Sequence, residues 1–318
     1  MMREDILSPL SEAVESVLGT LPAALSPLKA ETLEHAGGNR RALLVALLGR
    51  FFAVDREETM KTAAAVETVH LATLVHDDII DGARSRRGGP ALARSRGLGC
   101  ALLLGDLLFI KGIAAVNSLR RRTLTARILE TGAAICAGEL LEDESRPEFP
   151  PGAHRCLRIA RLKTASLFVF AAAAPGILGG RDRRTIAALE CLGLNLGLAY
   201  QIADDCLDLA PPGFHLGKDR LADLRNGTSN LALALAAGEP RLRKRIAEAR
   251  GGARARLEKI GEAVRSGGAV SRAADWGLRF IARAGTAADR IGLRRRRSGF
   301  EEYLEDSARR LRTCGSWS

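Results

Sequence analysis

The sequence predicts an all-α protein, and composition and patterning both support this. Of the 318 residues, 47% are apolar, 27% are charged and only 4% are aromatic. Long Ala- and Leu-rich stretches with few aromatic residues suit packed helices better than a β-sandwich. Apolar side chains also recur at intervals of three and four along almost the whole chain, which is the period of an amphipathic helix. No linker rich in Ser, Gly or Pro divides the chain, so we expect a single domain over residues 1–318.

The helices expected from this period follow one another along the chain. The first two cover the apolar positions of residues 6–18 and 43–48, on either side of a Gly37-Gly38 break. A long helix is expected over 55–81, because acidic residues from Asp55 onward suit a helix N-terminus. Turns with Gly or Pro separate most of the later helices. These are expected over 98–118, 124–141, 153–174, 182–209, 219–237, 240–249, 253–266, 270–284 and 298–312.

Charge, cysteine usage and the N-terminal residues argue against several classes of protein. The formal net charge is +11, but 41 of the 48 cations are Arg and they are spread along the chain, so we expect no nucleic-acid binding. The six cysteines form no C-x-x-C pair, which favours reduced thiols over a zinc site or disulfides. The longest uncharged run, 165–180, is too short to span a membrane, and no signal-peptide pattern opens the chain. We therefore expect a cytoplasmic protein with no transmembrane segment.

Two acidic motifs of the form D-D-x-x-D give the main functional signal. They are Asp77-Asp78-Ile79-Ile80-Asp81 and Asp204-Asp205-Cys206-Leu207-Asp208. On a helix, the first and last Asp of each motif share one face, about 6 Å apart at Cβ. Carboxylates this close repel one another, so we expect a cation there, and oxygen ligands without nearby Cys favour Mg²⁺. Because Mg²⁺ usually completes its coordination with water and phosphate oxygens, the substrate is expected to contain phosphate.

With these motifs the chain resembles the trans-isoprenyl diphosphate synthase (polyprenyl synthetase) family, from about Gly37 to about Leu235. The resemblance implies an isoprenoid synthase-type helical bundle with a central active-site cavity, and it implies a homodimer. It also implies a Mg²⁺-dependent condensation of an allylic prenyl diphosphate with isopentenyl diphosphate, which gives a longer trans-prenyl diphosphate. The ordered motifs behind it are V-E-T-V-H-L-A-T-L-V-H-D-D-I-I-D, S-R-R-G-G-P, L-G-D, L-K-T-A, Y-Q-I-A-D-D-C-L-D, and G-K-D followed by D-L-R-N-G.

The resemblance assigns metal ligands and substrate contacts residue by residue. Direct metal ligation falls on Asp77, Asp81 and Asp204, with Asp78, Asp205 and Asp208 in support. Holding the diphosphate oxygens through Mg²⁺ stabilises the negative charge that develops as the allylic C–O bond breaks. The residues expected to bind the allylic diphosphate are Arg86, Lys163 and Lys218, with Thr164 and Gln201 near the reacting carbons.

The segment expected to bind isopentenyl diphosphate departs from the family pattern. Members usually have G-G-K-R-x-R-P, whereas this chain reads Gly37-Gly38-Asn39-Arg40-Arg41-Ala42-Leu43 and lacks the Lys and the second Arg. Arg40 and Arg41 remain as expected contacts, together with His70 and Arg87. A second departure replaces G-K-x-T by Gly227-Thr228-Ser229-Asn230. A charge-assisted contact contributes about 1.5–3 kcal/mol, so both changes predict weaker binding, most of all of isopentenyl diphosphate.

These departures leave two other interpretations open beside chain elongation. An enzyme of the same fold that ionises an allylic diphosphate without isopentenyl diphosphate, such as a cyclase or a transferase to another acceptor, would retain both acidic motifs. A non-catalytic subunit of a heteromeric synthase would account for the missing cations but not for the intact aspartates. Product analysis separates the three.

Small residues before the first motif predict the product length. Ala72, Thr73 and Thr68 stand where a growing prenyl chain would run along the helix toward its N-terminus. Twelve residues of helix span about 18 Å, so an open channel would hold more than three isoprene units. We therefore expect products of C20 or longer. The alternative is that these small residues only permit close helix packing.

Overall fold

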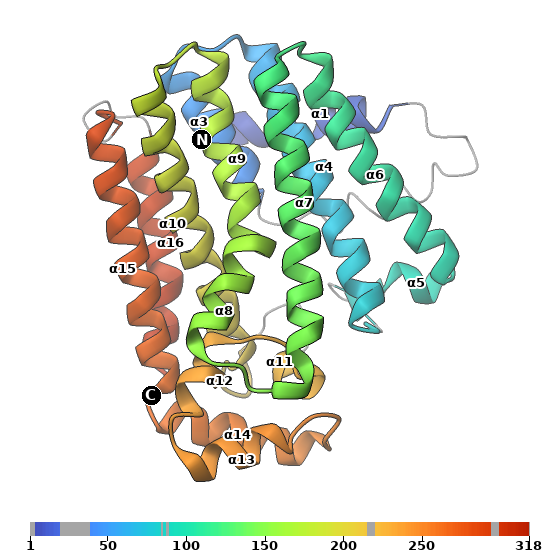
Figure 1. The fold of residues 1–318 in the computed structure, drawn as a ribbon, viewed down its shortest axis with the longest axis vertical. Coiled ribbons are helices and arrows are strands. Elements are labelled where there is room, and N and C mark those ends of the chain that lie inside the picture. The colour runs from blue at the N-terminus through green and yellow to red at the C-terminus, as the bar shows by residue number, and fades with distance from the viewer. Residues whose placement is uncertain are drawn as a thin grey trace. The chain divides into compact units, whose positions relative to one another are not determined.

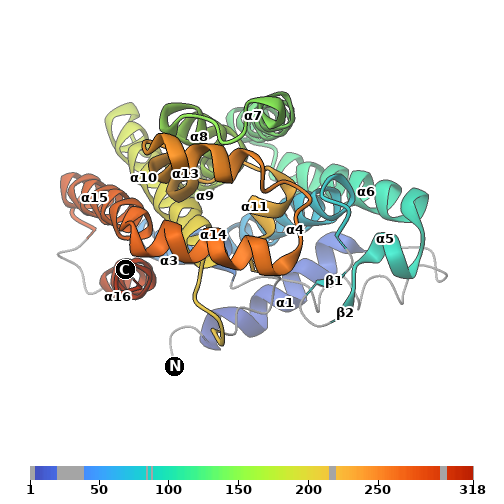
Figure 2. The ribbon, with the colours of Figure 1, turned by 90° about the horizontal axis from the view of Figure 1, so that it is seen from below.

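A computed structural model describes residues 4–19, 39–83, 85–86, 89–214, 220–293 and 299–317. Within them nearly all regular structure is helical, and one short antiparallel ribbon joins β1 (Ser85–Arg86) to β2 (Gly89–Pro90) (Figure 2). The all-α prediction is confirmed. The helices, shown in Figure 1, are α1 (Glu4–Leu18), α3 (Arg40–Phe51), α4 (Arg56–Ile80), α5 (Leu92–Ser95), α6 (Leu98–Ser118), α7 (Arg122–Ser145), η2 (Arg146–Glu148), α8 (Ala153–Ala160), η3 (Arg161–Ala165), α9 (Ser166–Leu178), α10 (Arg183–Asp208), α11 (Ala222–Asn226), α12 (Leu231–Ala236), α13 (Pro240–Ala247), α14 (Arg254–Ser266), α15 (Ala269–Arg290) and α16 (Phe300–Gly315).

The chain divides into two compact units, and the division passes through α7, α9 and α10. Unit 1 comprises Met1–Thr131 and Phe170–Glu190, and unit 2 comprises Gly132–Val169 and Cys191–Ser318. In unit 1, α4 packs against α1, α3 and α6. In unit 2, α15 and α16 run side by side, and α12 contacts α15 (Figure 1). Each unit contains one of the two acidic motifs.

The limits of α4 follow from its sequence. Asp55 is the N-cap residue, and its Oδ1 accepts the Glu58 N–H at 3.0 Å. Acidic residues in the first turn add a favourable interaction with the helix dipole. The helix ends at Ile80, and Gly82 follows with φ of 60°, a left-handed conformation that glycine adopts without strain. The helix predicted over 55–81 is confirmed.

The single helix predicted over 219–237 is wrong. Two short helices, α11 and α12, cover the described part of that range. Gly227 ends α11 with φ of 71°, and Asn230 begins α12 by accepting the Leu233 N–H at 3.1 Å. Asn at an N-cap competes with helix continuation, because its side chain replaces a backbone acceptor. The predicted run 153–174 also differs, since it is built from α8, the π-helical turn η3 and α9.

Two helices, α6 and α10, are long and apolar enough to cross a membrane by length and composition alone. The core helix of a folded protein passes the same test, and 61% of the apolar window of α10 is buried. The corresponding share for α6 is only 33%. Its exposed apolar residues are Leu98, Leu102, Leu103 and Ile110. The residues after Gly97 therefore form a helix with one apolar face against α4 and another that faces outward.

Candidate active site

The first acidic motif lies at the C-terminal end of α4. Asp77 is partly exposed and Asp81 is exposed, whereas Asp78 is buried. The Asp81 N–H donates to the Asp77 carbonyl at 2.8 Å, so the two residues are one helical turn apart on the same face. Their carboxylates fit the predicted pair of direct metal ligands. Asp78, turned toward the interior, fits the supporting position.

His76, which precedes the motif, is held by α6. Its Nε2 lies 3.3 Å from Asp106 Oδ1 and 3.4 Å from the Leu102 carbonyl. A Cβ at Gly105 would lie 2.2 Å from the same Nε2, so a side chain there would displace the His76 ring. The L-G-D motif therefore has a role that the sequence interpretation left unassigned. Gly105 permits the close approach, and Asp106 fixes the ring beside Asp77.

The segment expected to bind isopentenyl diphosphate forms the start of α3. Asn39 is the N-cap residue with φ of 50°, a left-handed conformation that Asn tolerates better than most residues. Arg40 and Arg41 follow and are only 7% and 6% exposed. The Ala42 N–H donates to Glu67 Oε1 at 3.0 Å and so connects α3 to α4. The two arginines are present as predicted, but they lie largely inside the protein.

Glu67 is a residue that the sequence interpretation missed. Burial raises the pKa of Glu67, while the charge of Arg41 and the Ala42 N–H act in the opposite direction. Among the described residues, its Oε2 has no hydrogen-bond partner. Glu67 stands three residues before His70, on the same side of α4. The acid within V-E-T-V-H was a usable signal, because a carboxylate among buried helix positions needs a specific reason to be there.

The residues predicted to set product length have packing roles in unit 1. Thr68 and Ala72 are fully buried, and Thr68 Oγ1 donates to the Ala64 carbonyl at 2.8 Å. Thr73 is partly buried and donates to the His70 carbonyl at 2.7 Å. A Cβ at Gly112 would lie 2.6 Å from a methyl of Val69, so α6 packs closely on this part of α4. Control of chain length by these residues stays a prediction.

The second acidic motif ends α10, and two of its aspartates bind backbone groups. Asp205 Oδ2 accepts the Leu231 N–H at 2.8 Å, and its Oδ1 accepts from Gln201 Nε2 at 2.9 Å. Asp208 accepts the N–H groups of Ala222 and Asp223 at 2.9 and 3.2 Å. Both carboxylates therefore hold the chain after α10 in place. They fit direct metal ligation less well than the supporting role predicted for them.

Burial, followed by repulsion from the Asp223 carboxylate, raises the pKa of Asp205 to about 8. The hydrogen bonds from Leu231 and Gln201 act in the opposite direction. Asp204 differs from its neighbour, since its side chain is 29% exposed and lies 3.4 Å from Arg310 on α16. In unit 2, Asp204 is thus the member of the motif best placed to reach an added ion.

Lys163, Thr164 and Gln201 come together as the resemblance implied. Lys163 and Thr164 lie on η3, a π-helical turn of the kind often found at functional sites. The Thr164 hydroxyl donates to Gln201 Oε1 at 2.6 Å. A Cβ at Gly138 would lie 2.6 Å from the Lys163 backbone nitrogen, so α7 approaches this turn closely. The turn η3 and the helix α10, which are far apart in sequence, therefore bring the predicted substrate contacts Thr164 and Gln201 together.

Two glutamates that were not predicted surround Lys163. Its Nζ lies 2.5 Å from Glu139 Oε2 and 2.9 Å from Glu142 Oε2. Glu142 Oε1 also accepts the Ser229 N–H at 3.0 Å. The carboxylates fix the position of the ammonium group and connect it to the segment before α12. Glutamates one helical turn apart on α7 were the available sequence signal.

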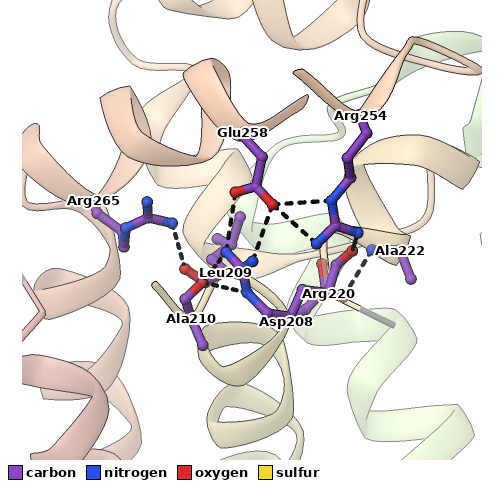
Figure 3. A network of polar contacts seen from close by, with 8 residues as sticks. All are labelled: Asp208, Leu209, Ala210, Arg220, Ala222, Arg254, Glu258 and Arg265. Atoms are coloured by element: carbon purple, nitrogen blue, oxygen red, sulfur yellow. Dashed lines mark hydrogen bonds and ion pairs between the residues drawn. The ribbon is translucent and has the colours of Figure 1, made fainter. Parts of the chain in front are cut away.

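A network of arginines holds the chain that follows α10 (Figure 3). Arg220 pairs with both oxygens of Glu258 at 3.0 and 3.1 Å, and its Nε donates to the Ala210 carbonyl at 2.7 Å. Arg265 donates to the Leu209 carbonyl at 2.9 Å, and Arg254 also pairs with Glu258. These contacts attach the residues beyond Asp208 to α14. The second motif therefore ends in a segment with a fixed backbone.

Three predicted contacts cannot be placed by their side chains. Arg86 lies in β1, and its side chain is outside the described part of the structure. Arg87 and Lys218 lie outside the described residues altogether. Their assignment rests on the sequence motifs alone.

The carboxylates of each motif fit a divalent cation. Among the described residues, no group of three or more His, Cys, Asp or Glu side chains is arranged to hold a metal. Mg²⁺ requires fewer protein ligands, because one or two carboxylates suffice when water and phosphate oxygens complete the octahedron. Asp77 with Asp81, and separately Asp204, supply hard oxygen donors of this kind. The donor set thus suits an ion that arrives with a diphosphate.

Comparisons with known proteins identify relatives of this chain. Heptaprenyl diphosphate synthase component 2 of Geobacillus stearothermophilus is 32% identical over 239 residues, which cover 75% of this chain and 73% of that protein. A short chain isoprenyl diphosphate synthase of Methanothermobacter thermautotrophicus is 33% identical over 244 residues, 73% of this chain and 74% of that protein.

A solved structure extends the similarity to nearly the whole fold. The polyprenyl synthase from Caulobacter crescentus CB15, complexed with calcium and isoprenyl diphosphate, has a TM-score of 0.87 at 27% identity, over 98% of this chain and 95% of that chain. The model of the polyprenyl synthetase family matches residues 23–266, a range that contains both acidic motifs and the segments around them. The chain belongs to the polyprenyl synthetase family.

Proposed function

We propose that the protein is a trans-prenyltransferase that condenses an allylic prenyl diphosphate with isopentenyl diphosphate to give a product of C20 or longer. The observation that supports this most is the hydrogen bond of 2.6 Å between Thr164 and Gln201, next to Lys163 and one helical turn before Asp204. This bond joins the expected substrate contacts of the L-K-T-A motif to the end of α10, which contains the second acidic motif. Relatives named for heptaprenyl and octaprenyl products support the longer chain length.

Each residue has a physical task in this reaction. Lys163, fixed by its two glutamates, provides a donor toward a diphosphate oxygen. The Thr164 and Gln201 side chains form a rigid polar pair that orients the allylic group near its reacting carbon. Asp77, Asp81 and Asp204 would hold Mg²⁺, which supplies positive charge to the leaving diphosphate when bound. The calcium complex of the Caulobacter relative supports a divalent cation next to a prenyl diphosphate.

Product analysis with labelled isopentenyl diphosphate tests the proposal. The protein is incubated with Mg²⁺ and geranyl, farnesyl or geranylgeranyl diphosphate, and the products are sized. Labelled products of C20 or longer are expected. Diphosphate release without incorporation of label would favour a cyclase or a transferase to another acceptor. No reaction with any pair, while a partner restores activity, would favour the non-catalytic subunit.

The metal assignment has its own test. Asp81→Ala and Asp204→Ala should each lower kcat/KM by several orders of magnitude, because each removes a carboxylate that would hold the ion that stabilises the leaving group. Excess chelator should abolish turnover, and Mg²⁺ should restore it. Glu57→Ala, which changes an exposed carboxylate at the far end of α4, is the control and should keep full activity.

We further propose a homodimer formed through the outward face of α6. Leu98, Leu102, Leu103 and Ile110 lie on this face at helical spacing and are exposed. A second copy would remove this apolar area from water. Leu103→Glu with Ile110→Glu should convert a dimer into a monomer in light scattering after gel filtration. A wild-type monomer would instead favour a heteromeric partner, as the name of the Geobacillus component suggests for that protein.

Both compact units are proposed to act as one synthase domain of a cytoplasmic protein. The family match extends across the division between the units, and three helices continue through it. The bundle is proposed to enclose the central cavity in which the prenyl chain grows. Limited proteolysis tests the single domain, because a separable unit would yield a stable fragment cut inside one of those helices.

A further inference from the structure

The second acidic motif has a cationic partner within the protein. Arg310 Nη2 lies 3.4 Å from Asp204 Oδ1. The guanidinium also lies over the ring of Tyr200, 5.2 Å from its centroid, within the range of a cation–π contact. Tyr200 and Asp204 are four residues apart on α10 and share one face. A single arginine of α16 therefore covers one side of the motif.

The position of Arg310 on α16 differs from that of its neighbouring arginines. Tyr303, Ser307 and Cys314 form the side of the helix turned toward the protein, and Arg310 falls on the same side. Arg309 and Arg312 are exposed and pair with acids on α16 itself, Asp306 and Glu305. Arg310 thus pairs with a residue of α10, whereas Arg309 and Arg312 pair with residues of their own helix.

The charges at this point explain why an arginine is tolerated there. Burial lowers the pKa of Arg310, but Asp204 and Tyr200 outweigh burial and hold that pKa above its ordinary value. Asp205 and Asp208 already use their carboxylates to accept hydrogen bonds from other groups. Asp204 is the carboxylate of the motif that is left to face an added cation, and within the described part of the chain Arg310 lies beside it.

We propose that Arg310 is an internal cation that competes with the divalent metal for Asp204 and so weakens metal binding at the second motif. This inference rests on the proposed metal-binding role of Asp204. A guanidinium and a metal ion cannot both use the same carboxylate oxygen at full strength, because each withdraws the same lone pairs and the two cations repel. Metal entry therefore requires the Arg310 contact to lengthen or break.

Direct metal binding tests this inference without any prenyl substrate. Mn²⁺ is titrated into the purified protein, with and without inorganic pyrophosphate, and free Mn²⁺ is measured by electron paramagnetic resonance. Arg310→Gln should lower the Kd for Mn²⁺ by about three- to ten-fold, the range expected for loss of one partly buried ion pair. Arg309→Gln and Arg312→Gln are matched controls and should leave the Kd within about two-fold.

Two more variants identify the carboxylate and guard against misfolding. Arg310→Lys keeps a positive charge and should remain near the wild-type Kd. Adding Asp204→Asn to Arg310→Gln should abolish the gain. Weaker or unchanged Mn²⁺ binding by Arg310→Gln, with a normal circular dichroism spectrum, would overturn the inference. The Mn²⁺ titration does not measure prenyl transfer. A failed product analysis would therefore contradict the proposed function, whereas an unchanged Kd of Arg310→Gln would contradict this inference.

Discussion

Asn230 provides the most informative single test of how the second motif is supported. It is 1% exposed, and its side chain makes three hydrogen bonds. Its Nδ2 donates to the Asp205 carbonyl at 2.9 Å and to Asp223 Oδ2 at 2.8 Å, while its Oδ1 accepts the Leu233 N–H at 3.1 Å. Asn230→Ala removes all three at once. It therefore removes the N-cap of α12 and leaves two acceptors without this donor, the buried Asp205 carbonyl and the half-buried Asp223 carboxylate.

The expected loss of unfolding free energy is about 3.5–4 kcal/mol. Losing an N-cap costs about 1 kcal/mol, and leaving a buried neutral acceptor unsatisfied costs about 1 kcal/mol more. The hydrogen bond to the Asp223 carboxylate adds about 1.5–2 kcal/mol, because bonds to charged groups are stronger. Asn230→Thr retains a capping oxygen but not the amide donor, so it should lose about 2.5–3 kcal/mol.

Urea unfolding followed by far-UV circular dichroism measures these losses at a fixed protein concentration. Thr228→Val is the matched control. Thr228 lies two residues before Asn230 and donates one hydrogen bond to Asp223, at 3.0 Å. It should lose about 1.5 kcal/mol. The reasoning is refuted if Asn230→Ala loses no more stability than Thr228→Val, because the capping and donor roles would then contribute nothing.

Three further predictions concern residues of unit 1. Asn39→Lys with Ala42→Arg should lower KM for isopentenyl diphosphate with little effect on the allylic substrate, since it restores two charge-assisted contacts; an unchanged KM in steady-state assays would place this segment away from that substrate. Ala72→Phe should shorten the products, measured by mass spectrometry, and a wild-type enzyme that stops at C15 would show that another wall limits growth. Burial raises the pKa of Glu67 in the folded protein above its ordinary value, so the folded protein binds this proton more tightly than the unfolded chain does. Stability relative to Glu67→Gln should therefore fall as pH rises from about 4.5 through the raised pKa, by at most about 1.4 kcal/mol per pH unit, and a rise over that window would contradict the assignment.

The fold could be predicted from the sequence wherever one helix lies in one continuous apolar pattern. The range expected for α6, 98–118, matches the structure, and Asp55 and Gly82 mark the ends of α4 as their residue types predict. The pattern failed over 219–237, where apolar residues continue at helical spacing but the backbone turns at Gly227. Periodicity records which residues are buried, and it does not show where a side chain such as Asn230 replaces a backbone acceptor.

The sequence predicts metal ligands and substrate contacts for the candidate site, but it does not reveal the residues that hold them in place. Asp204 and Lys163 stand out in motifs, because carboxylates and lysines among apolar residues need a chemical explanation. Arg310 and Glu142 were missed, since each lies far in sequence from the group it contacts and one-dimensional spacing contains no information on that contact. Glu67 was visible within a quoted motif, but its role became clear only from the bond to α3.

Both departures from the family pattern remove positive charge close to the start of a helix. Asn39 occupies a left-handed N-cap at the start of α3, and Asn230 caps α12. In the same segment the Thr228 hydroxyl bonds to Asp223, at the position where the family has a Lys. The substitutions therefore remove charge and leave the helix starts intact. A loss limited to charge weakens the binding of a diphosphate in the ground state and transition state alike, so it raises KM more than it lowers kcat. The effects on KM and kcat therefore distinguish two kinds of enzyme. An elongation enzyme with weakened binding would condense isopentenyl diphosphate at high concentration, whereas an enzyme that does not use this substrate would not condense it at any concentration.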